Sequence, residues 1–320
     1  MSSLHRVEPG MGGFSRRRAG RGFTYWAANG HRISDGDQLN RIRDLVIPPA
    51  WQDVWIAADP DAHIQATGVD QAGRTQYLYH PGWRAQQDHE KFIRSLAFAQ
   101  TLPELRRRVT RDLRGRNERR RALAAAVRLI DSLALRVGNE VYAEENGSFG
   151  ASTLQRRHVD VQDDTVHLVF RGKAEAQWDV RTRDRDLARF FTDRPRTPRS
   201  APAVCWPEQT GRRRAWRGVS AAEINEYVGR AAGGHFTAKD FRTWQGTVVA
   251  AGALGRALGA GETSPRAVTE AVHVTAEALH NTPSVARSSY INPRVIELFE
   301  KGVTIQGRPS DRKILDLLSP

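Results

Sequence analysis

Residues 281–293 read Asn281-Thr-Pro-Ser-Val-Ala-Arg-Ser-Ser-Tyr290-Ile-Asn-Pro293, and Tyr290 within this segment is a candidate nucleophile. A phenol has a pKa of about 10, so roughly one tyrosine in a thousand is ionised at neutral pH and cations must stabilise the phenolate. Three candidate cations precede the segment, namely Arg136, Lys173 and Arg242. Arginine keeps its charge and grips two phosphate oxygens, whereas lysine can also give a proton to a leaving oxygen. This division of labour indicates cleavage of a DNA strand through a covalent phosphotyrosine.

Further motifs surround these residues along most of the chain. In the second half they are Leu135-Arg136-Val-Gly-Asn-Glu140, Arg171-Gly-Lys173 and Lys239-Asp-Phe-Arg242. Near the start they are Ile47-Pro-Pro-Ala-Trp51, His63-Ile-Gln-Ala-Thr-Gly68 and Gly73-Arg-Thr-Gln-Tyr-Leu-Tyr-His-Pro81. In this order the motifs resemble the type IB DNA topoisomerases, specifically the bacterial and poxvirus-like branch.

The resemblance implies an α+β fold, with a small β-rich amino-terminal domain and a larger, mainly α-helical catalytic domain of the tyrosine recombinase/type IB topoisomerase type. It implies that supercoiled duplex DNA is relaxed by transient single-strand cleavage and religation through a 3′-phosphotyrosyl intermediate, with no ATP, metal or other cofactor. Tyr290 would be the nucleophile and Lys173 the proton donor to the leaving oxygen. The donors to the non-bridging oxygens would be Arg136, Arg242 and Asn281.

Asn281 departs from the pattern of the family, in which most relatives carry a histidine at this place. Asparagine still donates a hydrogen bond to a phosphate oxygen, but it carries no charge and moves no proton. The departure therefore concerns the rate of the reaction and not its nature.

DNA contacts are expected from Gln76, Tyr77, Tyr79, Tyr142 and Lys239. If residues 76–79 form a strand, Tyr77 and Tyr79 share one face and Gln76 takes the other, so a regular strand cannot present all three to DNA. For Lys239 the sequence leaves two roles open, a catalytic contact or a plain phosphate contact.

The composition agrees with a DNA-binding protein. The chain has 320 residues, a hydrophobic content of 39% and a formal net charge of +13, which favours a polyanionic partner over a neutral one. An anionic membrane is the competing partner, but we find no apolar run or signal sequence and expect a cytoplasmic, nucleoid-associated monomer that closes as a clamp around duplex DNA. The single cysteine, Cys205, has apolar neighbours and is expected to be buried.

Three regions are expected along the chain: a basic flexible arm over 1–22, a β-rich DNA-clamp domain over 23–90 and a mainly helical catalytic domain over 91–320. A helix ending at Gly138 and Asn139 would deliver Arg136, and a hairpin turn would carry Lys173. Capping residues predict further helix starts at Ser220, Thr237, Ser264, Thr282 and Asn292, the last of these opening the final helix. The arginine runs 106–108, 119–121 and 212–214 are candidates for DNA phosphate contacts.

Two other functions remain open from the residues. A tyrosine recombinase shares this chemistry, although it generally has a histidine where Lys239 stands. A non-enzymatic DNA-coating protein would need only the positive charge. The ten histidines have no spacing typical of metal ligands, and His273 and His280 are interpreted as packing residues.

Overall fold

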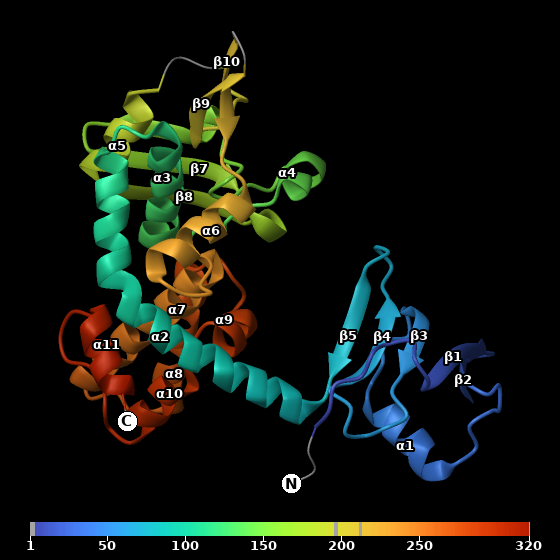
Figure 1. Cartoon of the computed structure of the whole chain (residues 1–320). Helices are drawn as coiled ribbons and strands as arrows, with labels where there is room; N and C mark the ends of the chain where they lie inside the picture. The colour runs from blue at the N-terminus through green and yellow to red at the C-terminus, as the bar shows by residue number, and fades with distance from the viewer. Residues whose placement is uncertain (1–3, 195–197, 211–212, 320) are drawn as a thin grey trace. The chain divides into compact units, whose positions relative to one another are not determined.

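The computed structural model describes residues 4–194, 198–210 and 213–319. It divides into two compact units, the first ending at Lys91 and the second beginning at Phe92. The boundary that the sequence predicts, between residues 90 and 91, lies one residue from this division. The α+β class is confirmed, with a β-rich first unit and a mainly helical second unit (Figure 1).

The first unit is built on one antiparallel sheet with the strand order β2-β1-β3-β4-β5. Its strands are β1 Phe14–Ala19, β2 Gly22–Ala27, β3 Gln52–Ile56, β4 Ile64–Val69 and β5 Thr75–Tyr79, and α1 spans Gly36–Asp44. The helix begins where the Asp35 side chain accepts a hydrogen bond from the Gln38 amide. Ile42 from this helix packs with Val54 and Ile56 of the sheet to form a small core.

The prediction of a flexible arm over 1–22 is wrong for residues 14–19, which form strand β1 between β2 and β3. Phe14 is buried against this core. Arg16 donates to the carbonyls of Pro48 and Trp51 at 3.0 and 2.7 Å, and its guanidinium lies over the Phe23 ring. Apolar residues do not alternate along this strand, because its charged side chains bond to carbonyls and cover an aromatic ring. The sequence pattern therefore did not predict it.

The second unit holds most of the helices. Helix α2, Pro81–Arg114, begins in the first unit and continues into the second, followed by α3 Glu118–Leu133 and α4 Glu140–Asn146. Strands β6 Val159–Gln162, β7 Thr165–Arg171 and β8 Gln177–Arg183 form an antiparallel meander, and β9 Cys205–Thr210 pairs with β10 Arg213–Gly218. The remaining helices are α5 Arg185–Thr192, α6 Ala221–Ala232, α7 Ala238–Gly259, α8 Pro265–Ala278, α9 Pro283–Ser289, α10 Pro293–Glu300 and α11 Asp311–Leu318.

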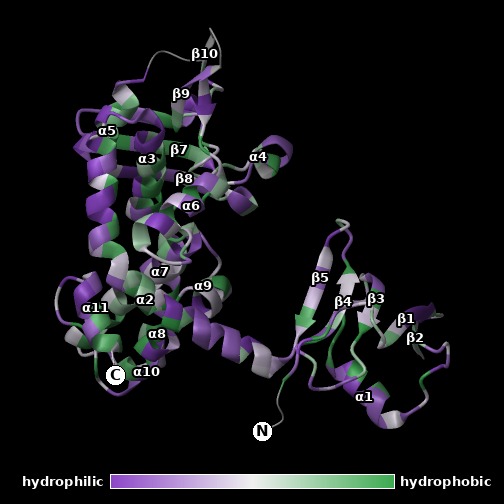
Figure 2. Cartoon of the chain, viewed as in Figure 1, coloured by the Kyte–Doolittle hydropathy of each residue, from purple (hydrophilic) through white to green (hydrophobic). Residues whose placement is uncertain are grey.

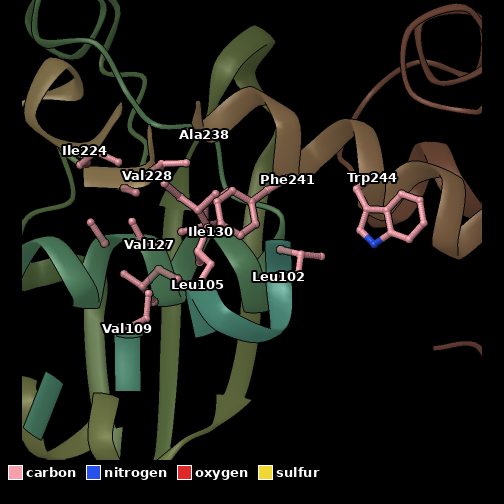
Figure 3. Close-up of a cluster of buried hydrophobic side chains, with 14 of the residues drawn as sticks. Leu102, Leu105, Val109, Val127, Ile130, Ile224, Val228, Ala238, Phe241 and Trp244 are labelled. Atoms are coloured by element: carbon pink, nitrogen blue, oxygen red, sulfur yellow. The ribbon is translucent and has the colours of Figure 1, made fainter. Parts of the chain in front are cut away.

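Helix α3 lies at the centre of the core of this unit. It packs against α6 and α7, and also against α5, β8 and β9. Ala124, Val127 and Ile130 on α3 are fully buried and lie near Leu105 of α2 and Phe241 of α7 (Figure 3). Figure 2 shows hydrophilic and hydrophobic turns along both α2 and α3, as expected for helices with one face in the core. The segment that contains Arg136 therefore follows directly after a rigid, well-packed helix.

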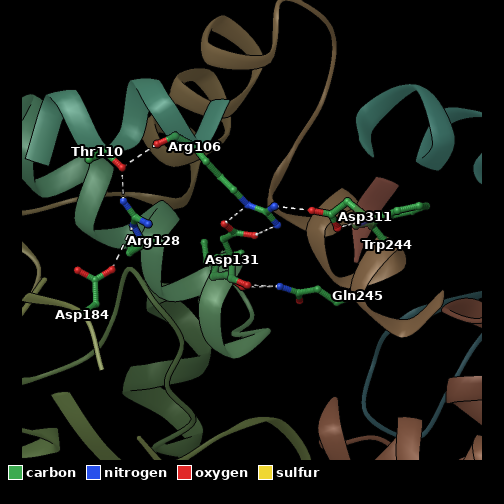
Figure 4. Close-up of polar contacts among 9 residues, drawn as sticks. Arg106, Thr110, Arg128, Asp131, Asp184, Trp244, Gln245 and Asp311 are labelled. Carbon is green, nitrogen blue, oxygen red and sulfur yellow. Dashed lines mark hydrogen bonds and ion pairs between the residues drawn. The ribbon is translucent and has the colours of Figure 1, made fainter. Parts of the chain in front are cut away.

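A network of hydrogen bonds and ion pairs connects α2, α3, α7 and α11. Arg106 of α2 forms a bidentate pair with Asp131 of α3 at 2.8 and 2.9 Å and also bonds to Asp311 of α11 (Figure 4). Trp244 of α7 donates its indole N–H to the same Asp311 at 2.6 Å. Burial opposes the charge of Arg106, but the two carboxylates raise its pKa above the usual value. Arg106 is thus a structural arginine that connects α2, α3 and α11.

The arginine runs mostly serve such internal contacts. Arg119 pairs with Glu223, and Arg121 pairs with Glu118 and Asp193. Arg212 and the side chains of residues 213 and 214 lie outside the described part of the chain. Arg106 and Arg121 are therefore structural arginines whose guanidinium groups are paired with carboxylates, and the prediction that other arginines of these runs contact DNA stays a prediction.

The predicted helix starts are confirmed at Ser220, Thr237, Ser264, Thr282 and Asn292, each of which is an N-cap. Two expectations need correction. The helix before Arg136 ends at Leu133, because Ala134 adopts a left-handed conformation with φ of 54°, and not at Gly138. Helix α11 follows α10, so Asn292 does not open the last helix.

Candidate active site

Arg136 and Asn281 come together although 145 residues separate them. Arg136 follows the left-handed turn at Ala134, and its carbonyl accepts a hydrogen bond from the Ala151 amide at 2.9 Å. Its guanidinium donates through Nη2 to Asn281 Oδ1 at 2.5 Å. Asn281 lies between α8 and α9, and its backbone N–H donates to the Ala276 carbonyl. Asparagine at this position therefore orients an arginine by accepting a hydrogen bond and keeps its N–H groups for another acceptor.

Arg242 holds the centre of this arrangement. It extends from the second turn of α7 and is only 3% exposed. Its Nη1 donates to the carbonyl of Ala134, and its Nη2 donates to the carbonyl of Leu279 at 2.7 Å. These carbonyls lie two residues before Arg136 and two residues before Asn281. Burial and the charge of Arg136 lower the pKa of Arg242 to about 10, which leaves it charged at neutral pH.

Tyr290 ends helix α9 and faces these cations. The ring centroid lies 5.2 Å from Arg242 Cζ. Burial alone would raise the pKa of Tyr290, but the charges of Arg242, Arg136 and Lys239 lower it below the usual value. A lowered pKa increases the fraction of phenolate, which is the form that attacks phosphorus.

The backbone of Tyr290 rests on α7 at a site without a side chain. A Cβ atom at Gly246 would lie 2.7 Å from both Cβ and the carbonyl oxygen of Tyr290. The next residue, Thr247, is fully buried and donates to that same carbonyl at 3.2 Å. Its hydroxyl also accepts a hydrogen bond from the Asn292 amide at 3.1 Å. Gly246 and Thr247 thus fix the position of the Tyr290 backbone against α7.

Lys173 lies on the turn between β7 and β8, as the sequence predicts. Its side chain is exposed, and it lines a cavity of about 680 Å³ together with Arg136, His280 and Asn281. The turn spans Lys173–Glu175, with Ala174 and Glu175 at φ of 58° and 60°. A lysine on such a turn can approach an atom bound in the cavity without a shift of the sheet.

Two N–H groups at this site have no hydrogen-bond partner among the described residues, although both are buried. They are Nε of Arg242 and Nδ2 of Asn281. A buried donor without an acceptor costs about 1–3 kcal/mol, so each such group in a folded protein calls for a reason. An anion with several oxygens, such as a phosphodiester, has the acceptors that these two groups would need.

The candidate DNA contacts lie in several places. Tyr77 and Tyr79 are exposed on one face of β5 with their rings 6.0 Å apart, whereas the half-buried Gln76 bonds to Asp70 at 2.8 Å on the other face. Lys239 is exposed in the first turn of α7 and acts on Tyr290 through its charge. Tyr142 lies in α4, and its side chain falls outside the described part of the structure.

Sequence reasoning missed Gly246 and Thr247, whereas it interpreted His280 as a packing residue, which its contact with Trp178 confirms. A glycine inside the pattern of a long helix is a signal of close packing, and it could have marked Gly246. His280 lies beyond the end of α8 with φ of 46°. Its ring stacks on Trp178 with centroids 3.8 Å apart.

Among the described residues, no group of three or more histidine, cysteine or acidic side chains is placed to hold a metal ion. Within the same residues, no helix has the length and apolar character needed to cross a bilayer. Cys205 is buried at the start of β9, and burial raises the pKa of its thiol.

Comparisons with known proteins agree along most of the chain. Residues 80–303 match the family described as "Eukaryotic DNA topoisomerase I, catalytic core", and residues 22–70 match "Bacterial DNA topoisomerase IB, N-terminal domain". DNA topoisomerase 1B of Acanthamoeba polyphaga mimivirus is 29% identical over 306 residues, which cover 91% of this chain and 88% of that protein. DNA topoisomerase 1 of Mycosarcoma maydis is 26% identical over 248 residues, covering 70% of this chain and 24% of that protein.

Proposed function

Because this chain belongs to the type IB DNA topoisomerases, we propose that Tyr290 is the nucleophile with which it cleaves one strand of duplex DNA. The observation that carries the proposal is the environment of this tyrosine, in which three cations lower the pKa of the phenol. Arg136 and Lys239 contribute to this shift after Arg242. The family match from 80 to 303 includes all the proposed catalytic residues.

The reaction is a transesterification at one phosphodiester of the DNA backbone. Tyr290 releases its phenolic proton to water, and the phenolate oxygen attacks phosphorus. The bond from phosphorus to the 5′ oxygen breaks as the 3′-phosphotyrosyl bond forms. Lys173 gives a proton to the leaving 5′ oxygen. The reverse attack by the 5′-hydroxyl reseals the strand, and because the number of phosphoester bonds is unchanged, no nucleotide is needed.

The donors around Tyr290 match the charge that develops in this step. Arg136, Arg242 and Asn281 are assigned to the non-bridging oxygens, where negative charge increases in the transition state. Two buried N–H groups without a partner among the described residues, Arg242 Nε and Asn281 Nδ2, support this assignment. The arginines contribute charge, and the asparagine contributes an oriented neutral donor.

The DNA-contact and assembly assignments extend the proposal. Tyr77 and Tyr79 are assigned to DNA because they form an exposed aromatic face, whereas Gln76 is assigned a supporting contact through Asp70. Tyr142 and Lys239 keep their assignments as phosphate or groove contacts. We further propose a monomer that closes around the duplex and associates with the nucleoid, since one tyrosine and one donor set complete a single-strand cut.

The test of the proposed function uses supercoiled plasmid. We expect the purified protein to relax it without ATP and in the presence of EDTA, because arginine and lysine supply the charge that a metal would otherwise bring. A product ladder of topoisomers on an agarose gel measures this. Loss of activity on chelation would contradict the charge assignment, recombined products would favour a recombinase, and binding without relaxation would favour a DNA-coating protein.

The contribution of Asn281 can be measured by two substitutions. Asn281→Ala is expected to slow single-turnover cleavage about 10²-fold, because it removes a donor to the phosphate and the acceptor of Arg136. Asn281→His should be tolerated, since an imidazole can also donate a hydrogen bond. Equal cleavage rates for the alanine variant and the unchanged protein would exclude the contact.

Gly246 gives a test of how Tyr290 is positioned. Gly246→Ala is expected to slow cleavage about 10-fold to 10²-fold, because the added methyl group displaces the tyrosine backbone. The matched control is Gly259→Ala at the end of the same helix, where a Cβ meets no atom within 4 Å. Single-turnover cleavage of a labelled duplex, with DNA affinity measured in parallel, distinguishes the two. A rate equal to that of the control would contradict the positioning role.

A further inference from the structure

One contact joins the turn that carries Lys173 to the segment that carries Asn281. Trp178 and His280 stack with ring centroids 3.8 Å apart and an angle of 24° between the planes. His280 immediately precedes Asn281, and Trp178 lies in β8 close to the turn of residues 173–175. The two aromatic rings therefore connect parts of the chain that lie about a hundred residues apart in sequence.

Trp178 is held in place by contacts with Phe170 and with the backbone of Gly172, next to the turn that carries Lys173. It is 3% exposed, lies opposite Phe170 in the sheet and stacks on that ring at 5.5 Å and 9°. The turn backbone rests on its indole, because a Cβ atom at Gly172 would lie 2.5 Å from Trp178 Nε1. The Gly172 amide bonds to the Ala176 carbonyl at 2.8 Å and closes the turn. Any displacement of the indole would thus displace the residue that precedes Lys173.

The residues of the turn have little burial of their own. Lys173, Ala174 and Glu175 are all exposed, and the latter two adopt left-handed backbone conformations. On the opposite side, His280 also adopts a left-handed conformation, which histidine, asparagine and aspartate adopt more often than other residues that carry a Cβ. In this conformation its ring makes the stacking contact with Trp178.

Resting on the proposed role of Lys173, we propose that the His280–Trp178 stack is a positioning contact that holds the Lys173 turn beside Asn281 and so aligns the lysine with the scissile phosphate. His280 acts through Lys173 and does not touch the reacting atoms. Both residues line the same cavity, together with Arg136 and Asn281.

The electrostatic environment suits a stacking ring. Burial lowers the pKa of His280, and the charges of Arg242 and Arg136 lower it further, so the imidazole is neutral at neutral pH. A neutral ring stacks on an indole without adding a charge beside the two arginines.

The test uses His280→Gly, because glycine accepts the backbone conformation at φ of 46° and removes only the ring. Two further variants complete the set. His280→Phe keeps an aromatic ring for stacking, and His235→Ala removes an exposed histidine that is not among the described residues lining this cavity. Each is measured for DNA affinity, thermal unfolding and single-turnover cleavage.

We expect His280→Gly to slow cleavage about 10-fold to 10²-fold with little change in DNA affinity, His280→Phe to recover most of the rate, and His235→Ala to cleave at the wild-type rate. The decisive readout is a double-mutant cycle with Lys173→Ala. If His280 acts through Lys173, the glycine substitution has no further effect in the Lys173→Ala background. Multiplicative effects of the two substitutions, or an unchanged rate for His280→Gly alone, would overturn the inference.

A second readout separates this inference from the proposed acid role of Lys173. In a duplex with sulfur in place of the bridging 5′ oxygen, the leaving thiolate needs no proton. Rescue of both Lys173→Ala and His280→Gly on this substrate is the expected result. Failure to rescue Lys173→Ala refutes its role as the acid, and the cycle still tests the positioning. If sulfur rescues Lys173→Ala but does not rescue His280→Gly, the positioning role of His280 is refuted, whereas the acid role of Lys173 stands.

Discussion

The Tyr290→Phe variant is expected to bind duplex DNA with nearly unchanged affinity and to relax no supercoils. The substitution removes only the nucleophilic oxygen, while the phosphate donors and the aromatic contact with Arg242 remain. No other described group is assigned to replace the lost phenol. Plasmid relaxation measures the loss of activity, and a gel assay for protein joined to a strand labelled at its 5′ end measures the loss of the covalent intermediate.

Tyr227→Phe is the matched control for this experiment. Tyr227 donates its hydroxyl to Asp112 at 2.8 Å, and burial together with this carboxylate raises its pKa. The two tyrosines thus have opposite environments, one with the phenolate disfavoured and one with it favoured. The control variant should lose stability but keep relaxation activity. Relaxation by a clean Tyr290→Phe preparation would exclude Tyr290 as the nucleophile.

The Lys173→Ala variant is expected to slow the cleavage step by about 10² to 10⁴, because an alkoxide leaves poorly without a proton. Replacement of the bridging oxygen by sulfur should remove most of this defect. Lys173 is exposed on a turn, so the substitution to alanine should not affect the fold. Single-turnover cleavage of the oxygen and sulfur duplexes gives the two rates.

Arg136→Ala provides the comparison for Lys173. Its guanidinium is proposed to contact the non-bridging oxygens and donates a hydrogen bond to Asn281, so the defect of Arg136→Ala should be similar on both substrates. If the Lys173 defect persists undiminished with sulfur, Lys173 is a transition-state clamp, and the proton donor has to be sought elsewhere. Lys239 is then the next candidate, because it is exposed near Tyr290 and acts on its pKa.

The sequence predicts the parts of this site that depend on local chemistry. The N-caps at Thr237 and Thr282 define where α7 and α9 begin, and the motifs around Arg136 and Lys173 fix the order of the donors. Local hydrogen bonds specify such features within a few residues, so no knowledge of the tertiary structure is needed.

The tertiary contacts could not be predicted in the same way. The stack of His280 on Trp178 and the seat of Tyr290 on Gly246 join segments that are distant in sequence. Arg106 and Arg16 read as surface charges, yet one is paired with two aspartates and the other donates to carbonyls of its own unit. A charged side chain carries no local signal for the partner it will meet in the folded chain.

The position of Arg242 has a consequence for the entropy of the reaction. Its two Nη groups fasten the backbone just before Arg136 and just before Asn281. The conformational freedom of both segments is therefore lost when the protein folds, at about 1–2 kcal/mol for each residue ordered, and not when DNA binds. In the proposed mechanism, the interaction energy of the scissile phosphate with Arg136 and Asn281 is then available to lower the barrier instead of ordering the site.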